Sequence, residues 1–216
     1  MVKYDPARDL KGTDTTHLVQ LFDSDQSIVE GVAQFVREGL WLNDQVLVVM
    51  TAERWNAVAM RLSVFGCPID EAVRFGRVIV RNTHDTLSKF MVSDRPHRGL
   101  FAATVGTLVE GQTASRRPVR IYGELVDVLT AEGLYRAALE LEELWNELAE
   151  QHRFTLLCGY TAGHFGDPNN SADLRRICAA HDNVAVDPED VLASFLVNRL
   201  DAASAESSSR LSSATA

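Results

Sequence analysis

Hydrophobic and polar residues alternate in blocks along the chain, and the block at residues 17–51 shows the pattern most clearly. Five mostly apolar residues at 18–22 end abruptly in Asp-Ser-Asp, which is typical of a buried strand that runs into a helix cap. Residues 28–40 carry apolar side chains at helical spacing, so they predict a helix with one apolar face. Gly39 and Asn43-Asp44 indicate a stop and a turn, and residues 46–50 are uninterruptedly apolar. The block therefore predicts a βαβ unit with a right-handed crossover.

The same alternation continues to residue 200. Further strands are predicted with cores at residues 78–80, 119–122 and 155–160. One helix is predicted to follow the capping cluster at residues 82–85 and to run through residue 91, and residues 94–99 are predicted to be loop. The other predicted helices cover residues 53–65, 69–74, 100–112, 125–129, 134–152, 171–181 and 191–200.

Strands that alternate with helices five times indicate the α/β class. We expect a three-layer fold, in which a largely parallel sheet of at least five strands lies between helices on both faces. A chain of 216 residues is enough for one domain with a substantial core. We therefore predict a flexible arm at residues 1–16, an α/β domain at residues 17–200, and a disordered tail rich in Ala and Ser at residues 201–216.

The turn after the first predicted strand decides whether this fold carries a phosphate site. In P-loop nucleotide-binding proteins the turn reads Gly-x-x-x-x-Gly-Lys-Ser/Thr, and its backbone N–H groups and lysine bind phosphates. Here residues 22–27 read Phe-Asp-Ser-Asp-Gln-Ser, with two carboxylates and neither glycine nor lysine. Because carboxylates repel a triphosphate, the sequence predicts a nucleotide-binding type of scaffold without a functional Walker A loop.

The net charge and the cysteines indicate which partners are disfavoured and in which compartment the protein is expected. With 21 basic and 30 acidic residues the formal charge is −9, which argues against nucleic acid and against an anionic membrane surface. Arg116, Arg117 and Arg120 form the densest basic run, which we interpret as a solvated loop before a strand. The three cysteines lack a close-spaced motif, and no segment resembles a signal peptide or a membrane span. We expect a cytoplasmic protein.

Polar and reactive side chains follow each predicted strand. In an open parallel sheet, ligands bind beyond the carboxyl ends of the strands, so these side chains can line a small-molecule pocket. They are Asp23, Ser24, Asp25, Thr51, Glu53, Asn82, Thr83, His84, Asp85, Tyr122, Glu124, Cys158, Tyr160 and Thr161. Taken singly, Asp23, Ser24, Asp25 and Thr83 are better explained as helix caps, and Cys158 as a small buried hydrophobe.

Glu124 has two interpretations of equal weight. Because it comes directly after a buried strand and a glycine, it can act as a general base or anchor a ligand. It can equally begin the next helix, where a carboxylate favours the N-terminus.

The sequence predicts no metal, no cofactor and no intact catalytic motif. Cys158, His164, Cys178 and His181 offer metal-binding groups, but no CxxC pair supports them and Cys178 lies on a predicted helix. A Gly-x-Ser-x-Gly nucleophile elbow is absent. A Cys/His pair is left open, because only the geometry can show one.

Several stretches of the chain, in register, resemble one family. They are residues 17–25, the turn at 39–49, Val-Arg-Ile-Tyr-Gly-Glu-Leu at 119–125, Leu-Glu-Leu-Glu-Glu-Leu-Trp-Asn at 139–146, Leu-Leu-Cys-Gly-Tyr at 156–160 and Ile-Cys-x-x-His at 177–181. Over residues 17–200 the chain resembles the MEDS sensory domain, named for methanogen and methylotroph regulators and a dichloromethane-responsive repressor. The family positions carried by the chain are His17, Tyr122, Gly123, Glu124, Cys158, Tyr160 and His181.

The resemblance implies a RecA-like or clock-ATPase-like α/β core that has lost its phosphate loop. It also implies a sensory role, often beside histidine kinase or DNA-binding modules, with small ligands derived from hydrocarbons. We recognise no such module in this sequence, so we expect the output to pass through a separate regulatory protein, such as a histidine kinase or a transcription regulator. The predicted ligand-binding residues are His17, Asp23, Ser24, Asp25, Thr51, His84, Tyr122, Glu124, Cys158, Tyr160 and His181.

Three functions are therefore compared. The leading prediction is a stand-alone, non-enzymatic sensory domain that binds a small ligand. The first alternative is an adaptor or homo-oligomer whose former pocket is filled, which the acidic helix at residues 134–152 and the tail favour. The second is a divergent nucleotide-binding enzyme or a hydrolase with Glu124 as base, although the lysine and the Ser/Thr that phosphoryl transfer needs are missing.

Overall fold

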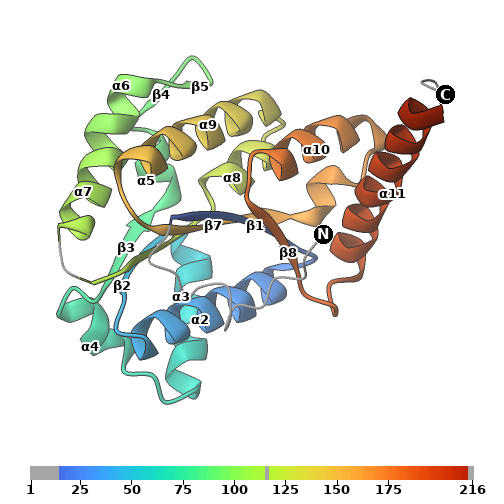
Figure 1. The fold of residues 1–216 in the computed structure, drawn as a ribbon. Coiled ribbons are helices and arrows are strands. Elements are labelled where there is room, and N and C mark those ends of the chain that lie inside the picture. Colours follow the sequence, from blue (N-terminus) through green and yellow to red (C-terminus); the bar gives the residue numbers. More distant parts are fainter. Residues whose placement is uncertain (1–14, 115–116, 214–216) are drawn as a thin grey trace.

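Six parallel strands form the central sheet of the computed structural model, which describes residues 15–114 and 117–213, with side chains described up to residue 202. Their order across the sheet is β3-β2-β6-β7-β1-β8 (Figure 1). The strands are β1 (Thr16–Phe22), β2 (Gln45–Met50), β3 (Val78–Asn82), β6 (Val119–Gly123), β7 (Thr155–Thr161) and β8 (Asn183–Val186). The α/β class and the parallel sheet of at least five strands are confirmed.

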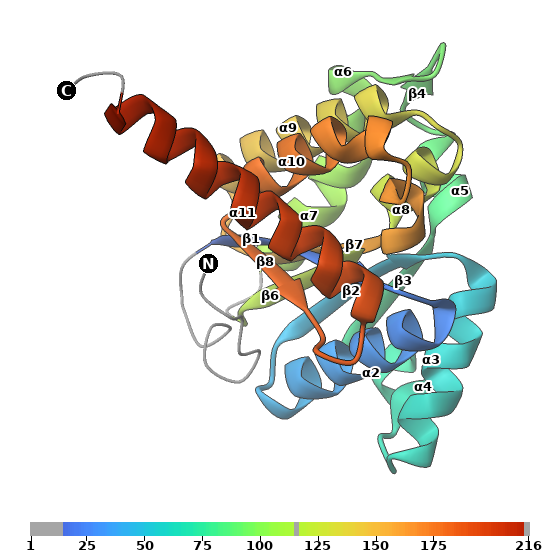
Figure 2. The same ribbon diagram turned by 90° about the vertical axis from the view of Figure 1, so that its right-hand side faces the viewer.

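Helices cover both faces of this sheet, so the fold has three layers (Figure 1). One face carries α2 (Asp25–Trp41), α3 (Ala52–Val64) and α4 (Ile69–Arg74). The other carries α5 (Thr83–Leu87), α6 (Arg98–Phe101), the π-helical η1 (Ala102–Gly106), α7 (Thr107–Thr113), α8 (Leu125–Ala131), α9 (Tyr135–Gln151), the 3-10 turns η2 (Ala162–Phe165) and η3 (Pro168–Asn170), and α10 (Ser171–Ala179). The last helix, α11 (Val191–Ser213), follows the β8 edge and packs into the same side (Figure 2).

Alternate residues of each strand supply two separate cores. On β1, Val19 and Leu21 face the side of α8, α9 and α10, whereas Leu18 and Phe22 face α2 and α3. All six residues of β2 are buried, as expected for a parallel strand that is covered on both faces. The alternation places His17 of β1 and Cys158 of β7 on the α9 side, which matters for the site described below.

The turn after β1 caps two helices. Ser24 is the N-cap of α2 and forms a capping box with Ser27. Asp23 instead accepts hydrogen bonds from the N–H groups of Leu192 and Ala193, each at 2.8 Å, and so caps the start of α11 about 170 residues later. The capping interpretation of Asp23 and Ser24 therefore holds, and Asp23 serves a helix that is remote in sequence.

The two predicted ends of the domain fall partly within the described residues. Most of the predicted arm at residues 1–16 lies outside them, and Thr16 already begins β1. Residues 201–213, which were predicted to be part of a disordered tail, belong to α11, which continues to Ser213. The segment contains no Gly or Pro, and its several alanines have the highest helix propensity, so nothing in it ends the helix.

A small hairpin replaces the loop predicted at residues 94–99. The preceding helix α5 ends at Leu87, and β4 (Met91–Val92) pairs with β5 (Arg95–Pro96). Ser93 and Asp94 join them with positive φ angles of 48° and 59°, the conformation of a tight hairpin turn. Arg95 pairs with Glu140 of α9, so the hairpin covers part of the acidic side of that helix.

Arg120 contradicts the interpretation of the basic run as a solvated loop. Its side chain is 2% exposed, and its Nε donates to Asp44 at 2.8 Å. Arg120 lies at the amino end of the sheet, where it ties β6 to the turn between α2 and β2. Within the described residues, no helix combines the length and apolar character that a membrane crossing requires.

Candidate functional site

The predicted ligand residues meet in two places rather than one. The members of the first group are buried between the sheet and the layer of α9 and α10; they are His17, Cys158, Tyr160 and His181. The members of the second group lie at the carboxyl edge of the sheet; they are Asp25, Thr51 and Glu124. The two groups are described separately because different elements build them.

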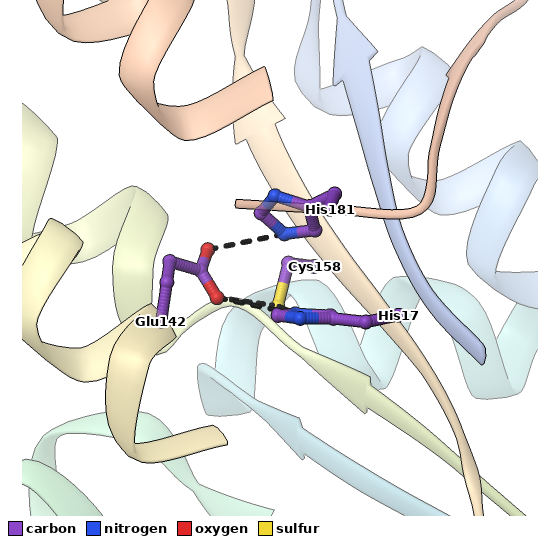
Figure 3. A group of neighbouring side chains, drawn as sticks. All are labelled: His17, Glu142, Cys158 and His181. Atoms are coloured by element: carbon purple, nitrogen blue, oxygen red, sulfur yellow. Dashed lines mark hydrogen bonds and ion pairs between the residues drawn. The ribbon is translucent and has the colours of Figure 1, made fainter. Parts of the chain in front are cut away.

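Glu142 of α9 is the centre of the buried group, and the sequence analysis missed it. Its carboxylate is fully buried and lies 3.2 Å from His17 Nε2 and 3.4 Å from His181 Nε2. It also accepts hydrogen bonds from Tyr160 OH at 2.6 Å and from Cys158 Sγ at 3.4 Å. Figure 3 shows His17, Glu142, Cys158 and His181 turned toward one another.

The two histidines of this group are held on their outer sides. His17 Nδ1 lies 2.8 Å from Asn146 Oδ1, and the amide of Asn146 donates to the carbonyl of Ala180 at 3.1 Å. His181 Nδ1 lies 2.7 Å from the carbonyl of Ile177. Both Nδ1 atoms therefore face acceptors, and both Nε2 atoms face Glu142. The two rings are tilted against each other by 46°, with centroids 4.0 Å apart.

Burial and mutual charge shift the pKa values in this group. Burial alone raises the pKa of Glu142, but the charge and hydrogen bonds of His181 and His17 outweigh it and hold that pKa well below its usual range. Burial lowers the pKa of His17, yet the hydrogen bond and charge of Glu142 raise it above its ordinary value overall. Burial and the Glu142 carboxylate together raise the pKa of Cys158 and Tyr160 well above their ordinary values. Cys158 is thus a thiol, and Glu142 a carboxylate, in this environment.

The group at the sheet edge is organised by Arg54 of α3. Its Nη1 donates to Glu124 Oε2 at 3.1 Å and to Asp127 Oδ2 at 2.8 Å, and its Nε donates to Asp25 Oδ1 at 2.9 Å. Asp127 of α8 also accepts from the backbone N–H of Thr161 at 2.7 Å. The arginine thereby joins residues that follow β1 and β6 at the carboxyl edge of the sheet, and Asp127 links them to the end of β7.

Glu124 lies at the start of α8, the position that the second interpretation of this residue expected. It occupies the N-cap position of α8, but its side chain makes no capping hydrogen bond there. The carboxylate instead accepts from the N–H of Thr51 and from Thr83 Oγ1, the latter at 3.2 Å, and pairs with Arg54. Glu124 is fully buried, so it joins the starts of α3 and α5 behind the edge of the sheet.

A pocket of about 590 Å³ opens in front of this network, and we name it the Arg54 pocket. Its lining residues come from α2, α3, α8 and the end of β7; they are Asp25, Val29, Thr51, Glu53, Arg54, Ala57, Asp127, Val128, Ala131, Thr161 and His164. His164 Nε2 lies 3.2 Å from Asp127 Oδ1. The volume is in the range of small-molecule sites, which is about 300–1,000 Å³.

The remaining predicted residues lie apart from both groups. Ser24 lines a second pocket of about 450 Å³ between α2 and the β8–α11 connection. His84 is exposed in the first turn of α5. Tyr122 is fully buried on the side of α2 and α3, and its hydroxyl has no hydrogen-bond partner in the described part of the chain. The metal set weighed from the sequence is not assembled either, because His164 contacts Asp127 while Cys158 and His181 face Glu142.

Two kinds of signal could have found the missed residues. Glu142 lies four residues after Ala138 and three before Trp145, so it interrupts the apolar stripe of α9 with a carboxylate. Arg54 and Asp127 each lie in the first turn of a helix that follows a strand, one residue after Glu53 and three residues after Glu124, the last strand-end side chains considered there. The sequence shows that each residue lies near the end of a strand, but it does not show that Arg54 and Asp127, which are 73 residues apart, pair with each other.

A comparison with known protein families gives a match over most of the chain. A family model described as "MEDS: MEthanogen/methylotroph, DcmR Sensory domain" matches residues 16–182. The matched range contains every predicted ligand residue, from His17 to His181, as well as Arg54, Asp127 and Glu142. No curated protein matches the chain.

Proposed function

The chain belongs to the MEDS family of sensory domains, and from that premise we propose that it binds a small neutral or cationic molecule in the Arg54 pocket and signals through a regulatory protein partner. The observation that carries the proposal is the pocket itself, which lies at the carboxyl edge of a parallel sheet. Ligands of open α/β sheets bind at this edge. Two residues predicted from the sequence, Asp25 and Thr51, line it.

The charge of the Arg54 pocket favours one class of ligand. Three carboxylates line it, those of Asp25, Glu53 and Asp127, against one guanidinium, that of Arg54. Arg54 is already paired with Asp25 and Asp127, so it is not available to bind an anion. A surplus of carboxylates repels phosphate and carboxylate ligands and suits an alcohol, an amine or another small derivative of a hydrocarbon.

The same charge argues against the nucleotide-binding alternative. A triphosphate would meet the carboxylates of the turn after β1 and of the pocket, and the turn offers no lysine to offset them. Glu124 is committed to Thr51, Thr83 and Arg54, which leaves it poorly placed as a general base. We therefore propose a non-enzymatic domain whose core is RecA-like and lacks a phosphate loop.

The adaptor alternative draws support from α11. Val191 and Phe195 of that helix are 73% and 55% exposed, and large exposed apolar side chains are frequent in protein interfaces. Because Asp23 caps α11 and Asp25 lines the Arg54 pocket two residues later, partner binding at α11 is compatible with ligand binding in the pocket. We propose α11 as the surface that the regulatory partner contacts.

Ligand binding can be tested with a variant that fills the pocket. Ala57 lines the Arg54 pocket from the exposed side of α3, so Ala57→Trp occupies the space without removing an ion pair. Native mass spectrometry of the gently purified protein, followed by thermal unfolding with methanol, methylamine and dichloromethane as probes, reports binding to the wild type. We expect an adduct or a rise in unfolding temperature that Ala57→Trp abolishes.

The matched control is Asn56→Trp, which adds the same side chain to an exposed neighbouring position outside the pocket lining. It should bind like the wild type. Binding that survives Ala57→Trp would place the ligand elsewhere. An adduct with the mass of a nucleotide would overturn the proposal in favour of the enzyme alternative.

A further inference from the structure

The buried group around Glu142 offers four potential metal ligands at one point. His17 comes from β1, Glu142 from α9, Cys158 from β7 and His181 from the turn between α10 and β8. One donor atom of each lies within 4.8 Å of all the others, and none of the four residues is more than 9% exposed (Figure 3). Segments that are remote in sequence therefore deliver two imidazoles, a carboxylate and a thiol to the same place.

The distances between these donors match the edges of a small coordination tetrahedron. His17 Nε2 lies 3.3 Å from Cys158 Sγ and 3.2 Å from the Glu142 carboxylate. Cys158 Sγ lies 3.4 Å from the same carboxylate oxygen, and His181 Nε2 lies 3.4 Å from the other oxygen. Tetrahedral zinc bound at its usual 2.0–2.3 Å places neighbouring donor atoms about 3.3–3.6 Å apart. All four donor atoms lie within 4.8 Å of one another, so the wider pairs must close in by about 1 Å to enclose an ion.

The contacts behind the ligands orient the correct atoms inward. The carbonyl of Ile177 can only accept a hydrogen bond, so Nδ1 of His181 carries a proton and Nε2 is the nitrogen turned to the centre. Asn146 uses its NH₂ group on Ala180 and turns its oxygen to Nδ1 of His17, so that Nδ1 carries a proton in the same way. Histidines that bind metals typically donate their other N–H in this way. His181 Nε2 is buried and lies 3.4 Å from the Glu142 carboxylate.

The charges are also those of a metal site. The cationic partners of Glu142 within ion-pair distance are His17 and His181, both imidazoles. A divalent ion would be balanced by the Glu142 carboxylate and by Cys158 as a thiolate, which leaves a neutral centre in a buried place. Tyr160 donates to Glu142 at 2.6 Å and would hold the coordinating carboxylate in position.

We propose that His17, Glu142, Cys158 and His181 bind one divalent transition-metal ion, with zinc as the ion that this donor set fits best. Mixed nitrogen, sulfur and oxygen ligands in a four-coordinate arrangement are characteristic of zinc. Four protein ligands leave no open position, so the ion is structural and joins β1, β7, α9 and the turn before β8. On binding, the ion replaces the thiol proton of Cys158 and any proton on Nε2 of His17 and His181, and these protons are released to solvent without any redox change.

This proposal departs from the prediction of no metal made from the sequence. It also stands apart from the proposed ligand function, because none of the four residues lines the Arg54 pocket. The two can therefore fail independently.

The test is metal analysis and cobalt substitution of the full chain, purified without a polyhistidine tag. We expect about one zinc ion per chain after incubation with zinc and gel filtration. After removal of the ion with a chelator, Co²⁺ should give a thiolate-to-cobalt charge-transfer band in the near ultraviolet and intense visible bands of tetrahedral coordination. Absence of bound metal, or a weak octahedral cobalt spectrum without the thiolate band, would overturn the proposal. That outcome would show a hydrogen-bonded Glu–His cluster instead.

Variants identify the ligands. Cys158→Ser should abolish the charge-transfer band, whereas Cys178→Ser, a matched change outside the group, should keep it. If Cys178→Ser removes the band and Cys158→Ser does not, the ion lies elsewhere and the assignment is wrong. If Cys158→Ser fails to fold, the cobalt spectrum of His181→Gln tests the site instead. This variant keeps the thiol and changes one nitrogen donor, so its visible bands should differ from those of the wild type. Unaltered visible bands in that variant would exclude His181 as a ligand.

Discussion

At the scale of a single residue, Tyr122 shows how closely side chains pack against the backbone in the interior. Its side chain is fully buried, and its hydroxyl has no hydrogen-bond partner among the described residues. Gly159 of β7 lies beside it, and a Cβ at that position would collide with the hydroxyl and lie 3.0 Å from two ring carbons. The glycine is therefore required by the space that the tyrosine ring takes, and no unusual backbone angle is involved.

Gly159→Ala is expected to lower the free energy of unfolding by about 1–3 kcal/mol, because a buried ring and a strand backbone cannot both move away. Tyr122→Phe removes an unpaired buried hydroxyl and should be neutral or stabilising. In the double variant the cost of the alanine should shrink, since the nearest clashing atom is gone. Chemical denaturation of the three variants measures these differences.

Gly163→Ala is the matched control, because a Cβ there would meet only Thr161 at 4.0 Å. It should change the unfolding free energy little. If Gly159→Ala lowers the free energy of unfolding equally with and without the Tyr122 hydroxyl, the hydroxyl is not the cause of the destabilisation. The clash would then be with the tyrosine ring or with the strand backbone.

At the scale of single residues, the sequence identified most of the buried group around Glu142 but few of the residues that line the Arg54 pocket. His17, Cys158, Tyr160 and His181 were all predicted to bind a ligand, and they do meet, although at Glu142 in the interior rather than at the sheet edge. Glu142 was missed because local spacing assigns helix faces without saying what the opposite layer presents. The carboxylate is tolerated in the apolar stripe only because two histidines from remote segments lie opposite it.

At the scale of elements, α8 is the helix that holds the carboxyl edge together. Its Asp127 binds Arg54 of α3, the backbone at the end of β7, and His164 of η2. Burial alone raises the pKa of Asp127, but hydrogen bonds from His164, Arg54 and the N–H of Thr161 outweigh it and lower that pKa below its ordinary value. The folded state therefore holds the ionised form.

A lowered pKa in the folded state gives a stability that depends on pH with a definite sign. The contribution of Asp127 is complete above its unfolded pKa of about 4 and is lost as the pH falls through the folded value. Asp127→Asn should lower the unfolding free energy at pH 7 by about 1–3 kcal/mol. The difference from the wild type should shrink on acidification below about pH 4, as the wild-type carboxylate takes up its proton.

Urea unfolding of both proteins from neutral to acidic pH measures this difference. Asp173→Asn serves as the control, because Asp173 pairs with Arg176 at the surface and such pairs contribute about 0–1 kcal/mol. A gap between wild type and Asp127→Asn that stays constant with pH would show that the hydrogen-bond geometry, and not the ionised form, carries the stability.

The elements that periodicity predicted correctly are the long ones. The strands and helices from β1 to α4 follow the expected blocks closely, since each has a full apolar face. The short pieces were missed: β8 has four residues, and the β4–β5 hairpin has two residues in each strand. Pieces of this length carry too few residues for a period, and their partners in the fold decide their conformation.

At the scale of the whole molecule, the beginning and end of the described chain are tied together. Asp23 follows β1 and caps α11, while Asp190 before α11 accepts from the N–H of Asp23 at 3.2 Å. The backbone of His17 likewise exchanges hydrogen bonds of 2.8 Å with Asp182 before β8. The C-terminal part of the fold is thus attached chiefly through β1 and the turn that follows it.

Asp23→Ala should loosen α11 without unfolding the sheet. Removing both acceptors at the helix start costs about 1–2 kcal/mol, so amide hydrogen exchange in residues 191–200 should accelerate roughly tenfold. Hydrogen-exchange mass spectrometry measures this segment directly. Ser24→Ala is the matched control one residue later, because it removes the cap of α2 and should accelerate exchange at the start of α2 only. Equal protection of α11 in Asp23→Ala and the wild type would mean that apolar packing alone fixes the helix.

The turn after β1 takes part in both proposed binding surfaces, so ligand binding and partner binding can influence each other. Asp23 caps α11 and Asp25 lines the Arg54 pocket, so one short turn belongs to both of the proposed binding surfaces. Thermodynamic reciprocity requires that a ligand which strengthens partner binding by some factor be bound more tightly by the same factor once the partner is in place. The ligand concentration that produces a response would then depend on how much partner the cell contains. The level at which the partner is expressed would set this threshold as much as the affinity of the Arg54 pocket does.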